Sequence, residues 1–198
     1  MISFRCATCG HKFDVPDRLA GKKARCKHCQ ASIVVPQPVS LNQKLSPRQR
    51  RLLADEQALR STFADGPIRI VEAAGEPPER YVLDYLVRSL RKPGKGEPEQ
   101  VKGHRVQVVL PPDYPRLAPT VSMLTPVFHP NIDEATVCVG DHWAAGERLV
   151  DLLVRVGEIL TYQAYNIRSP LNGDAAMWAD LNGEKLPIDP VDLSALVE

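Results

Sequence analysis

Apolar residues recur at helical spacing in two long stretches of the chain. The first begins at Ser46-Pro47, a serine suited to an N-cap followed by proline at the first helical position, and continues to about residue 64. The second is strongly amphipathic, and its apolar positions are Leu149, Leu152, Leu153, Val156, Ile159 and Leu160. Shorter helices are predicted at residues 175–181 and 189–196, the latter because Asp189-Pro190 resembles a helix start.

Between the two long helices, β-branched and aromatic residues predict strands at residues 67–73, 81–90, 105–110 and 120–125. Short loops join these strands, which is typical of an antiparallel meander. A long segment of low regularity, residues 126–148, follows them, and loops of this length usually carry function. The predicted fold class is α+β: a four-stranded antiparallel meander with an N-terminal helix, a central crossing helix and C-terminal helices.

Four of the five cysteines form two identical motifs, Cys6-x-x-Cys9 and Cys26-x-x-Cys29. Such a pair of knuckles predicts a four-cysteine zinc ribbon, because two turns complete a tetrahedron around one ion. Four thiolates close the coordination shell, so the predicted zinc is structural and the neighbouring His11 and His28 are bystanders. The alternative is a redox dithiol, for which one pair would suffice.

The charge distribution supports a division into two modules. Residues 1–36 hold seven Lys/Arg and two Asp, although the whole chain has a net charge of only +1. We predict a ribbon at residues 1–36, a proline-containing linker at 37–45 and a larger domain at 46–198. The positive ribbon could attract nucleic acid, but Phe4 and Phe13 are few for base stacking, and a solvated basic face is favoured.

Nothing along the chain predicts insertion into a membrane. No uninterrupted apolar run approaches the ~20 residues that cross a bilayer, and the N-terminus lacks the apolar core of a signal peptide. We therefore expect a cytoplasmic protein with no membrane partner. Thiols stay reduced in that compartment, which again favours metal binding over disulfides.

The larger domain contains a series of short motifs. They are Leu110-Pro111-Pro112-Asp113-Tyr114-Pro115 with Pro119-Thr120-Val121, Phe128-His129-Pro130-Asn131-Ile132, Cys138, Trp143, and Ser169-Pro170-Leu171-Asn172. In order and spacing they resemble the ubiquitin-conjugating enzymes, from about Ser46 to the C-terminus. The first is similar to that family's proline-rich turn, the second to its signature tripeptide, and Cys138 lies close to where it keeps a thioester cysteine.

The resemblance implies that Cys138 accepts the activated C-terminus of a ubiquitin-like modifier and passes it to an amine. A thiolate suits this chemistry, because its ester is stable enough to hold and reactive enough to transfer. Cys138 is the one cysteine outside the knuckles and is placed in a loop. The alternative is a buried structural cysteine, which the flanking Val137 and Val139 would favour.

The resemblance also implies roles for the residues around the cysteine. Asn131 would donate an amide hydrogen to the oxyanion formed during transfer, or it would brace the loop. His129 is expected to tie the loop by hydrogen bonds. Ser169 falls where the family has a serine or aspartate near the incoming nucleophile, and a serine influences lysine deprotonation less than a carboxylate does. His142 could lower the pKa of the thiol or act as a base; a solvated loop histidine is the alternative.

The first helix carries arginines that resemble the basic face the family offers to an activating enzyme, although a merely soluble helix would look the same. They are Arg48, Arg50, Arg51 and Arg60. Cys138 lies closer to Asn131 and to Trp143 than is common in the family, and the residues after Trp143 lack the pattern that docks eukaryotic ligases. In these departures and in its ribbon, the chain resembles divergent bacterial conjugating enzymes. This resemblance implies an activating enzyme, a ubiquitin-like modifier and a metallopeptidase as partners, and a pathway that in some cases defends against phage.

Three functions remain open at this point. The chain is a conjugating transferase, an inactive relative that binds a ubiquitin-like partner, or a zinc-ribbon nucleic-acid adaptor whose larger domain is a scaffold. The presence of Cys138 in the loop favours the first.

Overall fold

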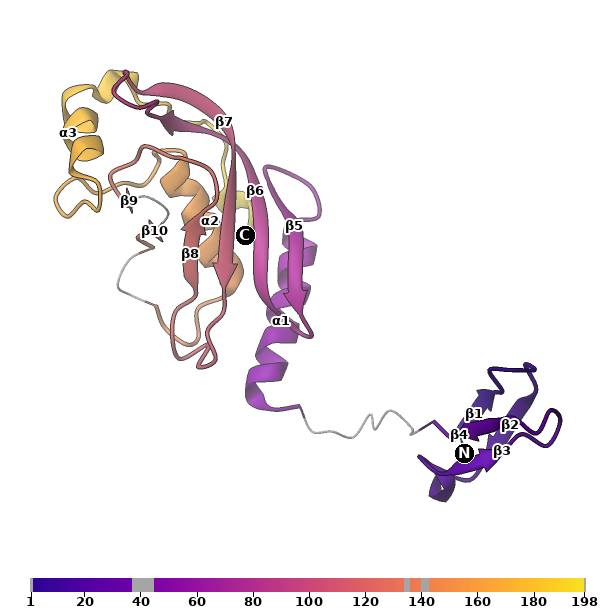
Figure 1. The fold of residues 1–198 in the computed structure, drawn as a ribbon. Coiled ribbons are helices and arrows are strands. Elements are labelled where there is room, and N and C mark those ends of the chain that lie inside the picture. Colours follow the sequence, from indigo (N-terminus) through magenta and orange to yellow (C-terminus); the bar gives the residue numbers. More distant parts are fainter. Residues whose placement is uncertain (1, 37–44, 134–135, 140–142, 198) are drawn as a thin grey trace. The chain divides into compact units, whose positions relative to one another are not determined.

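The computed structural model describes residues 2–36, 45–133, 136–139 and 143–197 of the 198-residue chain. Contacts divide the chain into two compact units, Met1–Lys44 and Leu45–Glu198 (Figure 1). The predicted linker, apart from Leu45, and His142 lie outside the described residues.

Two β-hairpins build the first unit, and one cysteine knuckle lies at the turn of each. The strands are β1 (Ile2–Arg5), β2 (Lys12–Val15), β3 (Lys23–Arg25) and β4 (Ser32–Val34), with a 3-10 turn η1 (Asp17–Leu19) between the hairpins. The antiparallel pairs are β1 with β2 and β3 with β4. Apolar residues in β1, β2 and β4 are consistent with these strands, whereas the sequence of β3, Lys23–Arg25, contains no such signal.

The two knuckles repeat each other at an interval of 20 residues. The N–H of Gly10 donates to the carbonyl of Cys6 at 2.8 Å, and the N–H of Gln30 donates to that of Cys26 at 2.9 Å. Both donor residues have a left-handed backbone, with φ of 72° at Gly10 and 61° at Gln30. Glycine adopts this conformation without steric cost, so the first knuckle has the residue its turn requires and the second does not.

The second unit begins with helix α1 (Pro47–Thr62). The Ser46 hydroxyl accepts from the N–H of Gln49 at 3.1 Å, and the Gln49 side chain accepts from the N–H of Ser46 at 2.9 Å. This capping box satisfies two helix N-terminal donors and fixes where the helix starts. The predicted start at Ser46-Pro47 is confirmed.

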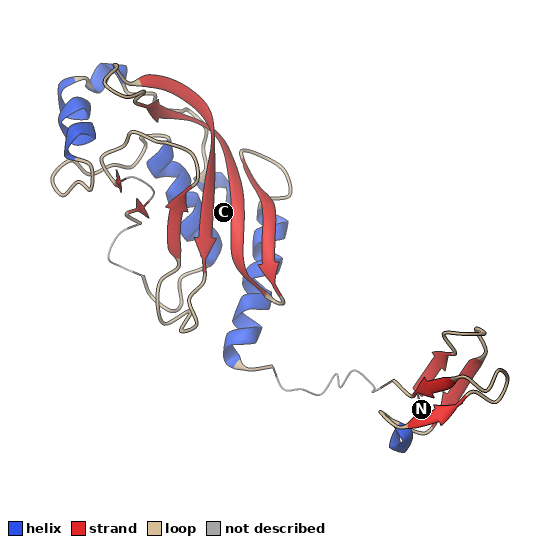
Figure 2. Ribbon diagram, in the orientation of Figure 1, coloured by secondary structure: helices blue, strands red, loops and turns tan. Residues whose placement is uncertain are grey.

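A sheet of six antiparallel strands forms the centre of the second unit, in the order β5-β6-β7-β8-β10-β9 (Figure 2). Its members are β5 (Ile68–Gly75), β6 (Pro78–Arg91), β7 (Glu99–Val109), β8 (Thr120–Met123), β9 (Ile132–Asp133) and β10 (Thr136–Val137). The predicted four-stranded meander is β5 to β8. The sheet continues through β9 and β10, two very short strands inside the long loop, where no periodicity could indicate them.

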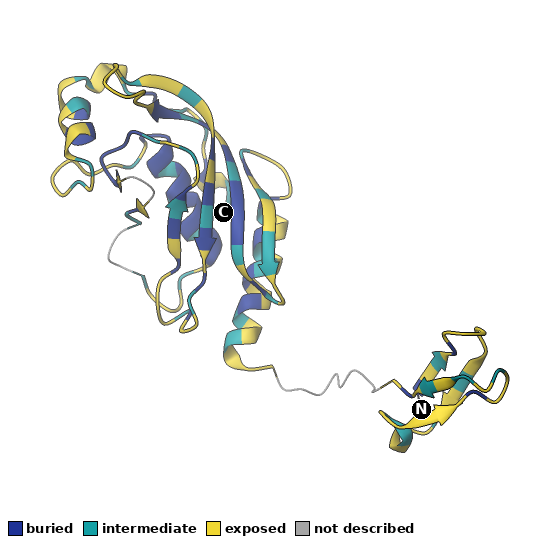
Figure 3. Ribbon diagram, viewed as in Figure 1, coloured by how far each residue is buried: buried dark blue, intermediate teal, exposed yellow. Residues whose placement is uncertain are grey.

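Helix α2 (Leu149–Leu160) packs across the sheet and is the most buried element (Figure 3). Its residues are buried on nearly every side, because the sheet, α1 and the C-terminal segment all pack against it. Leu193 of that segment is fully buried, and a Cβ at position 157 would lie only 2.5 Å from its Cδ1. Gly157 is therefore required by close approach between α2 and the C-terminal segment.

The remaining helices are shorter. Helix α3 (Gly173–Leu181) is present as predicted, and the Asn172 side chain caps it by accepting from the N–H of Ala175 at 3.0 Å. Beyond it lie two 3-10 turns, η2 (Gly183–Lys185) and η3 (Ser194–Leu196). Within the described residues, no helix has both the length and the apolar content needed to cross a membrane.

The predicted helix at residues 189–196 is wrong, since only η3 forms there. The Asp189 carboxylate, expected to cap that helix, accepts instead from the N–H of Arg88 at 2.9 Å and of Val191 at 3.1 Å. Arg88 lies at the irregularity in the pairing of β6 with β7. A tertiary hydrogen bond to the sheet has thus replaced a local helix cap.

Candidate functional site

The β9–β10 hairpin places Cys138 opposite Asn131. After the pair Val137–Ile132, the N–H of Cys138 donates to the carbonyl of Asn131 at 2.9 Å, which continues the register. Val137 is buried in the core and Val139 packs against it. Because side chains alternate along an extended chain, Cys138 points away from that core, and its side chain is partly exposed.

The Asn131 side chain is buried and is fastened to the chain at Asn166. Its Oδ1 accepts from the N–H of Asn166 at 2.7 Å, and its Nδ2 donates to the Asn166 carbonyl at 3.1 Å. This two-point contact joins the turn before β9 to the segment that follows α2. This contact braces the loop, which is one of the two roles expected for Asn131. Among the described residues, the second hydrogen on Nδ2 has no hydrogen-bond acceptor.

His129 holds the same turn from the inside. It is fully buried, its Nδ1 accepts from the N–H of Asn131 at 3.0 Å, and its ring lies 4.4 Å from the ring of Tyr162. Burial lowers the pKa of His129 to about 3, so the ring is neutral at physiological pH. A neutral, enclosed acceptor supports the backbone, and a structural role agrees with this geometry.

The segment containing Ser169 is attached to the turn between His129 and Asn131. The Pro130 carbonyl accepts from the N–H of Leu171 at 2.8 Å and from the N–H of Asn172 at 3.0 Å. Ser169 itself is exposed. The structure therefore brings the predicted motifs around residues 129–131, 138 and 169–172 to one region of the second unit.

Sequence reasoning missed Asn166 as the partner of the candidate asparagine. Its contribution comes from the backbone N–H and carbonyl, which every residue type offers, so no side-chain signal could have indicated it. Tyr162 was missed as well. Its hydroxyl donates to the Phe128 carbonyl and its ring contacts His129, so it supports the turn from the end of α2.

Arg51 joins α1 to the loop beyond Cys138, so it is not free on the basic face that the sequence suggested for this helix. Its guanidinium donates to the Asp55 carboxylate at 2.7 Å, to the Ala145 carbonyl at 2.8 Å and to the Glu147 carbonyl. It also donates to the Tyr114 hydroxyl at 3.1 Å, and Tyr114 in turn donates to Asp55 at 2.6 Å. We call this set, Arg51, Asp55 and Tyr114, the arginine clamp.

Trp143 belongs to the same loop and packs beside Tyr114. Its indole Nε1–H donates to the Pro115 carbonyl at 2.7 Å, and its ring lies 5.8 Å from that of Tyr114. The proline-rich turn, helix α1 and the loop before α2 are therefore fixed to one another.

The four arginines considered for α1 differ in their surroundings. Arg48 pairs with Glu79 at 2.7 Å and donates to the Pro111 carbonyl, and Arg51 belongs to the clamp. Arg50 and Arg60 are exposed, and Arg60 pairs with Glu56. Two of the four thus remain on the solvent side of the helix.

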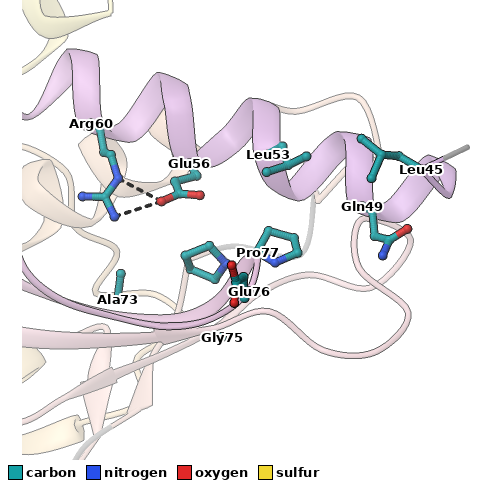
Figure 4. A pocket seen from close by; sticks show the side chains of 10 residues that line it. Leu45, Gln49, Leu53, Glu56, Arg60, Ala73, Gly75, Glu76 and Pro77 are labelled. Carbon is teal, nitrogen blue, oxygen red and sulfur yellow. Dashed lines mark hydrogen bonds and ion pairs between the residues drawn. The ribbon is translucent and has the colours of Figure 1, made fainter. Parts of the chain in front are cut away.

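An open groove of 610 Å³ runs between α1 and the β5–β6 turn (Figure 4). Leu45, Leu53 and the ion pair of Glu56 with Arg60 line its α1 side, and Ala73 and Pro77 belong to the residues on the other side. Cys138 and Asn131 are not among its lining residues. The groove is therefore a surface of α1 separate from the cysteine loop.

In the first unit the four knuckle cysteines gather into one cluster. The sulfurs of Cys6 and Cys29 lie 3.7 Å apart, as do those of Cys9 and Cys26, and all four lie within 4.8 Å of one another. A zinc ion with Zn–S bonds of ~2.3 Å needs tetrahedron edges of about 3.8 Å, so this sulfur set fits it. These residues could hold a metal, and with four thiolates no coordination position stays open for a substrate.

Backbone donors around the first knuckle favour the thiolate that a metal requires. The N–H of Cys9 and that of Thr8 lower the pKa of Cys6 to about 6. In the second knuckle the N–H of Cys29 is the main cause of a lowered pKa at Cys26. Each knuckle therefore lowers the pKa of its first cysteine through the same kind of backbone contact, whereas burial and the neighbouring thiols raise the pKa of its second cysteine, Cys9 or Cys29.

Comparison with known proteins agrees with the fold and the motifs. Residues 93–185 match the family model "Ubiquitin-conjugating enzyme". The E2 domain of a ubiquitin conjugating enzyme from Toxoplasma gondii has the same fold, with a TM-score of 0.52 at 19% identity over 69% of this chain and 89% of that one. Residues 93–185 are thus similar to the ubiquitin-conjugating enzymes, and the second unit has a UBC-like α+β fold as predicted.

Two curated relatives are similar in sequence over part of their length. Ubiquitin-conjugating enzyme E2 N of Drosophila melanogaster is 33% identical over 79 residues, which are 37% of this chain and 51% of that protein. Ubiquitin-conjugating enzyme E2 5 of Arabidopsis thaliana is 35% identical over 78 residues, 36% of this chain and 41% of that protein. The chain spans about half or less of these relatives.

Proposed function

We propose that this chain is a conjugating enzyme in which Cys138 carries a ubiquitin-like modifier as a thioester. The observation that carries the proposal is the position of a partly exposed Cys138 directly opposite Asn131 in one hairpin. The thiolate attacks the carbonyl of the modifier's activated C-terminus, and the thiol of the activating enzyme leaves. An acceptor amine then attacks the Cys138 thioester, an amide forms, and the Cys138 thiol is released.

Asn131 has two parts in this proposal. One Nδ2 hydrogen goes to the Asn166 carbonyl and fixes the side chain. The other is free to donate to the oxyanion that forms when the amine attacks, an interaction worth about 3 kcal/mol. Because the anchored amide cannot rotate away, the donor is in place before the reaction. Ser169 lies on the exposed rim where the amine would enter.

The partners follow from the family. A ubiquitin-like modifier is the group carried, and an activating enzyme supplies it. Helix α1 is the surface we assign to the activating enzyme, with exposed Arg50 and Arg60 and the groove of Figure 4 beside them. Arg48 and Arg51 support that surface from within, since their guanidinium groups are engaged with Glu79 and the loop.

We place this activity in a bacterial ubiquitin-like pathway in the cytoplasm, with a metallopeptidase as a further component and a link to phage defence. The short spacing from Asn131 to Cys138 and the fused four-cysteine unit support this assignment. The zinc would be structural. Genes for an activating enzyme, a modifier and a metallopeptidase beside this one would support the pathway, and their absence would oppose it.

A charging assay tests the proposal. The chain, its activating enzyme, the modifier and ATP should give a gel band that thiol removes. Cys138→Ala should give no band, whereas Cys138→Ser should give a band that resists thiol, because an oxygen ester replaces the thioester. The matched control is Cys29→Ala, which disturbs the knuckles and should still be charged.

The outcome separates the remaining readings. A chain that binds the modifier with unchanged affinity in Cys138→Ala and never forms the labile band is an inactive binding relative. Charging of Cys29→Ala but not of Cys138→Ala is expected only of a transferase that uses Cys138.

A further inference from the structure

Four aromatic rings form a continuous row on the first unit. Phe4 stacks on Phe13 with 5.4 Å between ring centroids, and His11 meets the edge of Phe13 at 5.2 Å. His11 then stacks on His28 at 5.4 Å, with the two ring planes only 7° apart. The row therefore crosses from the first hairpin to the second knuckle.

Solvent reaches one end of this row. Phe4 and Phe13 are half-buried, as expected for the apolar side of the β1–β2 hairpin, whereas His11 and His28 are exposed. The histidines predicted to be bystanders to the metal thus extend a ring surface that Phe4 and Phe13 alone would not provide. Nucleic-acid bases stack on histidine as well as on larger aromatic rings.

The positive charge of the unit lies partly away from the rings. Lys27 is exposed and adjoins the second histidine of the row in the sequence. Arg5 and Lys12 pair with each other one position from the Phe4–Phe13 pair, so their side chains lie on the other face of that hairpin, and Lys12 also has an acidic partner there. Bases would therefore stack on the rings, and phosphates would meet Lys27 and the unit's general excess of Lys/Arg over Asp.

We propose that this unit binds single-stranded nucleic acid, through the row of Phe4, Phe13, His11 and His28 and through the unit's excess positive charge. The bases of a double helix are stacked on one another and cannot stack on the rings. A duplex would therefore bind only through its phosphates and the positive charge of the unit. An anionic membrane fits less well, because among the described residues of this unit Val34 is the one large apolar side chain that is strongly exposed. The binding is independent of Cys138 and of the conjugating activity.

Fluorescence anisotropy with the zinc-loaded full chain tests the proposal. The probes are labelled 20-nucleotide single-stranded RNA, single-stranded DNA and duplex DNA. Single strands should bind more tightly than the duplex, and the affinity should fall as the salt concentration rises, because phosphates meet the unit's positive charge. His28→Gln should weaken single-strand binding about fivefold or more, and His28→Tyr should restore it, because tyrosine keeps a ring.

Matched controls separate stacking from charge and from misfolding. Lys95→Gln removes an exposed lysine of the second unit and should leave the affinity unchanged. Zinc content must be equal in all variants, and Cys138→Ala should bind as the unaltered chain does. The proposal is overturned if no probe binds at about 50 mM salt, or if His28→Gln binds as before while Lys27→Gln does not, which would indicate a basic surface only.

Discussion

A single neutral imidazole supports the turn on which the proposed chemistry depends. His129 is enclosed, its pKa is lowered to about 3 by burial, and the unfolded chain would titrate near 6.5. Between these values the unfolded state binds a proton that the native state does not. The native state therefore loses stability as the pH falls below about 6.5.

We predict that the free energy of unfolding of the second unit falls by about 1.4 kcal/mol between pH 7.5 and 5.5 because of His129. Urea unfolding followed by tryptophan fluorescence measures this, since Trp143 and Trp178 are the chain's two tryptophans and both lie in that unit. His129→Gln keeps an acceptor for the N–H of Asn131 and should reduce the pH dependence. Burial also lowers the pKa of His104, but this residue is present both in the unaltered chain and in His129→Gln. If the free energy of unfolding depends on pH equally in the two proteins, the assignment to His129 is contradicted.

At the scale of residues, the sequence indicated which side chains are candidates for chemistry. It did not indicate the contacts that hold those side chains in place. Cys138, Asn131 and His129 are candidates because of the motifs in which they stand, and the structure brings them to one region. The anchor of Asn131 could not be predicted, since Asn166 contributes only its backbone. The partners of Arg51 could not be predicted either. The sequence places this arginine on a helix, but it does not indicate the distant backbone carbonyls to which the guanidinium donates.

At the scale of elements, the arginine clamp makes α1 a support for the loop before α2. The guanidinium reaches carbonyls more than 90 positions away in the sequence and also holds the buried carboxylate of Asp55. Arginine can satisfy several acceptors at once because its five N–H donors lie in one plane.

Arg51→Ala should lower the free energy of unfolding by about 2 to 4 kcal/mol, because it leaves the Asp55 carboxylate buried without its cation. Arg51→Lys keeps the positive charge but loses the several N–H donors of the guanidinium. Its free energy of unfolding should therefore lie between those of the unaltered chain and Arg51→Ala. The control is Arg50→Ala, an exposed neighbour on the same helix, which should change stability by less than about 0.5 kcal/mol. Thermal unfolding measures all three, and equal melting temperatures for Arg51→Ala and Arg50→Ala would show that the clamp contributes nothing.

Elements with strong local signals were predictable, and elements defined by distant contacts were not. Helix α1 has a complete capping box, and α2 has a continuous apolar pattern, so both are where the sequence placed them. The predicted helix at residues 189–196 failed because Asp189 bonds to β6. The strands β9 and β10, of two residues each, are too short for any period to show.

At the scale of the whole molecule, the two units differ in what stabilises them. The second has a continuous core of buried side chains between one face of the sheet and the helices, whereas the described residues of the first bury few apolar side chains: Ile2 and Val35 beside Cys6 and Cys26. A unit of this size needs a further source of stability, which the sulfur cluster can supply by binding metal.

Removal of metal should therefore unfold the first unit and leave the second unchanged. We expect one zinc per chain, and a chelator should abolish slow amide exchange in Lys23–Arg25 while tryptophan-detected unfolding stays the same. Cys29→Ala should lose the metal, whereas Cys138→Ala should keep it. Retention of zinc by Cys29→Ala, or a chelator effect on the tryptophan signal, would contradict this.

The repeat of 20 residues in the first unit has a consequence for its origin. Each hairpin brings half of a sulfur set and the same turn, so a single ancestral hairpin paired with a second copy of itself could already have enclosed an ion. Duplication within one gene would then have joined the halves. Gln30 has the same left-handed backbone as Gly10 and is one position at which the two halves differ in residue type.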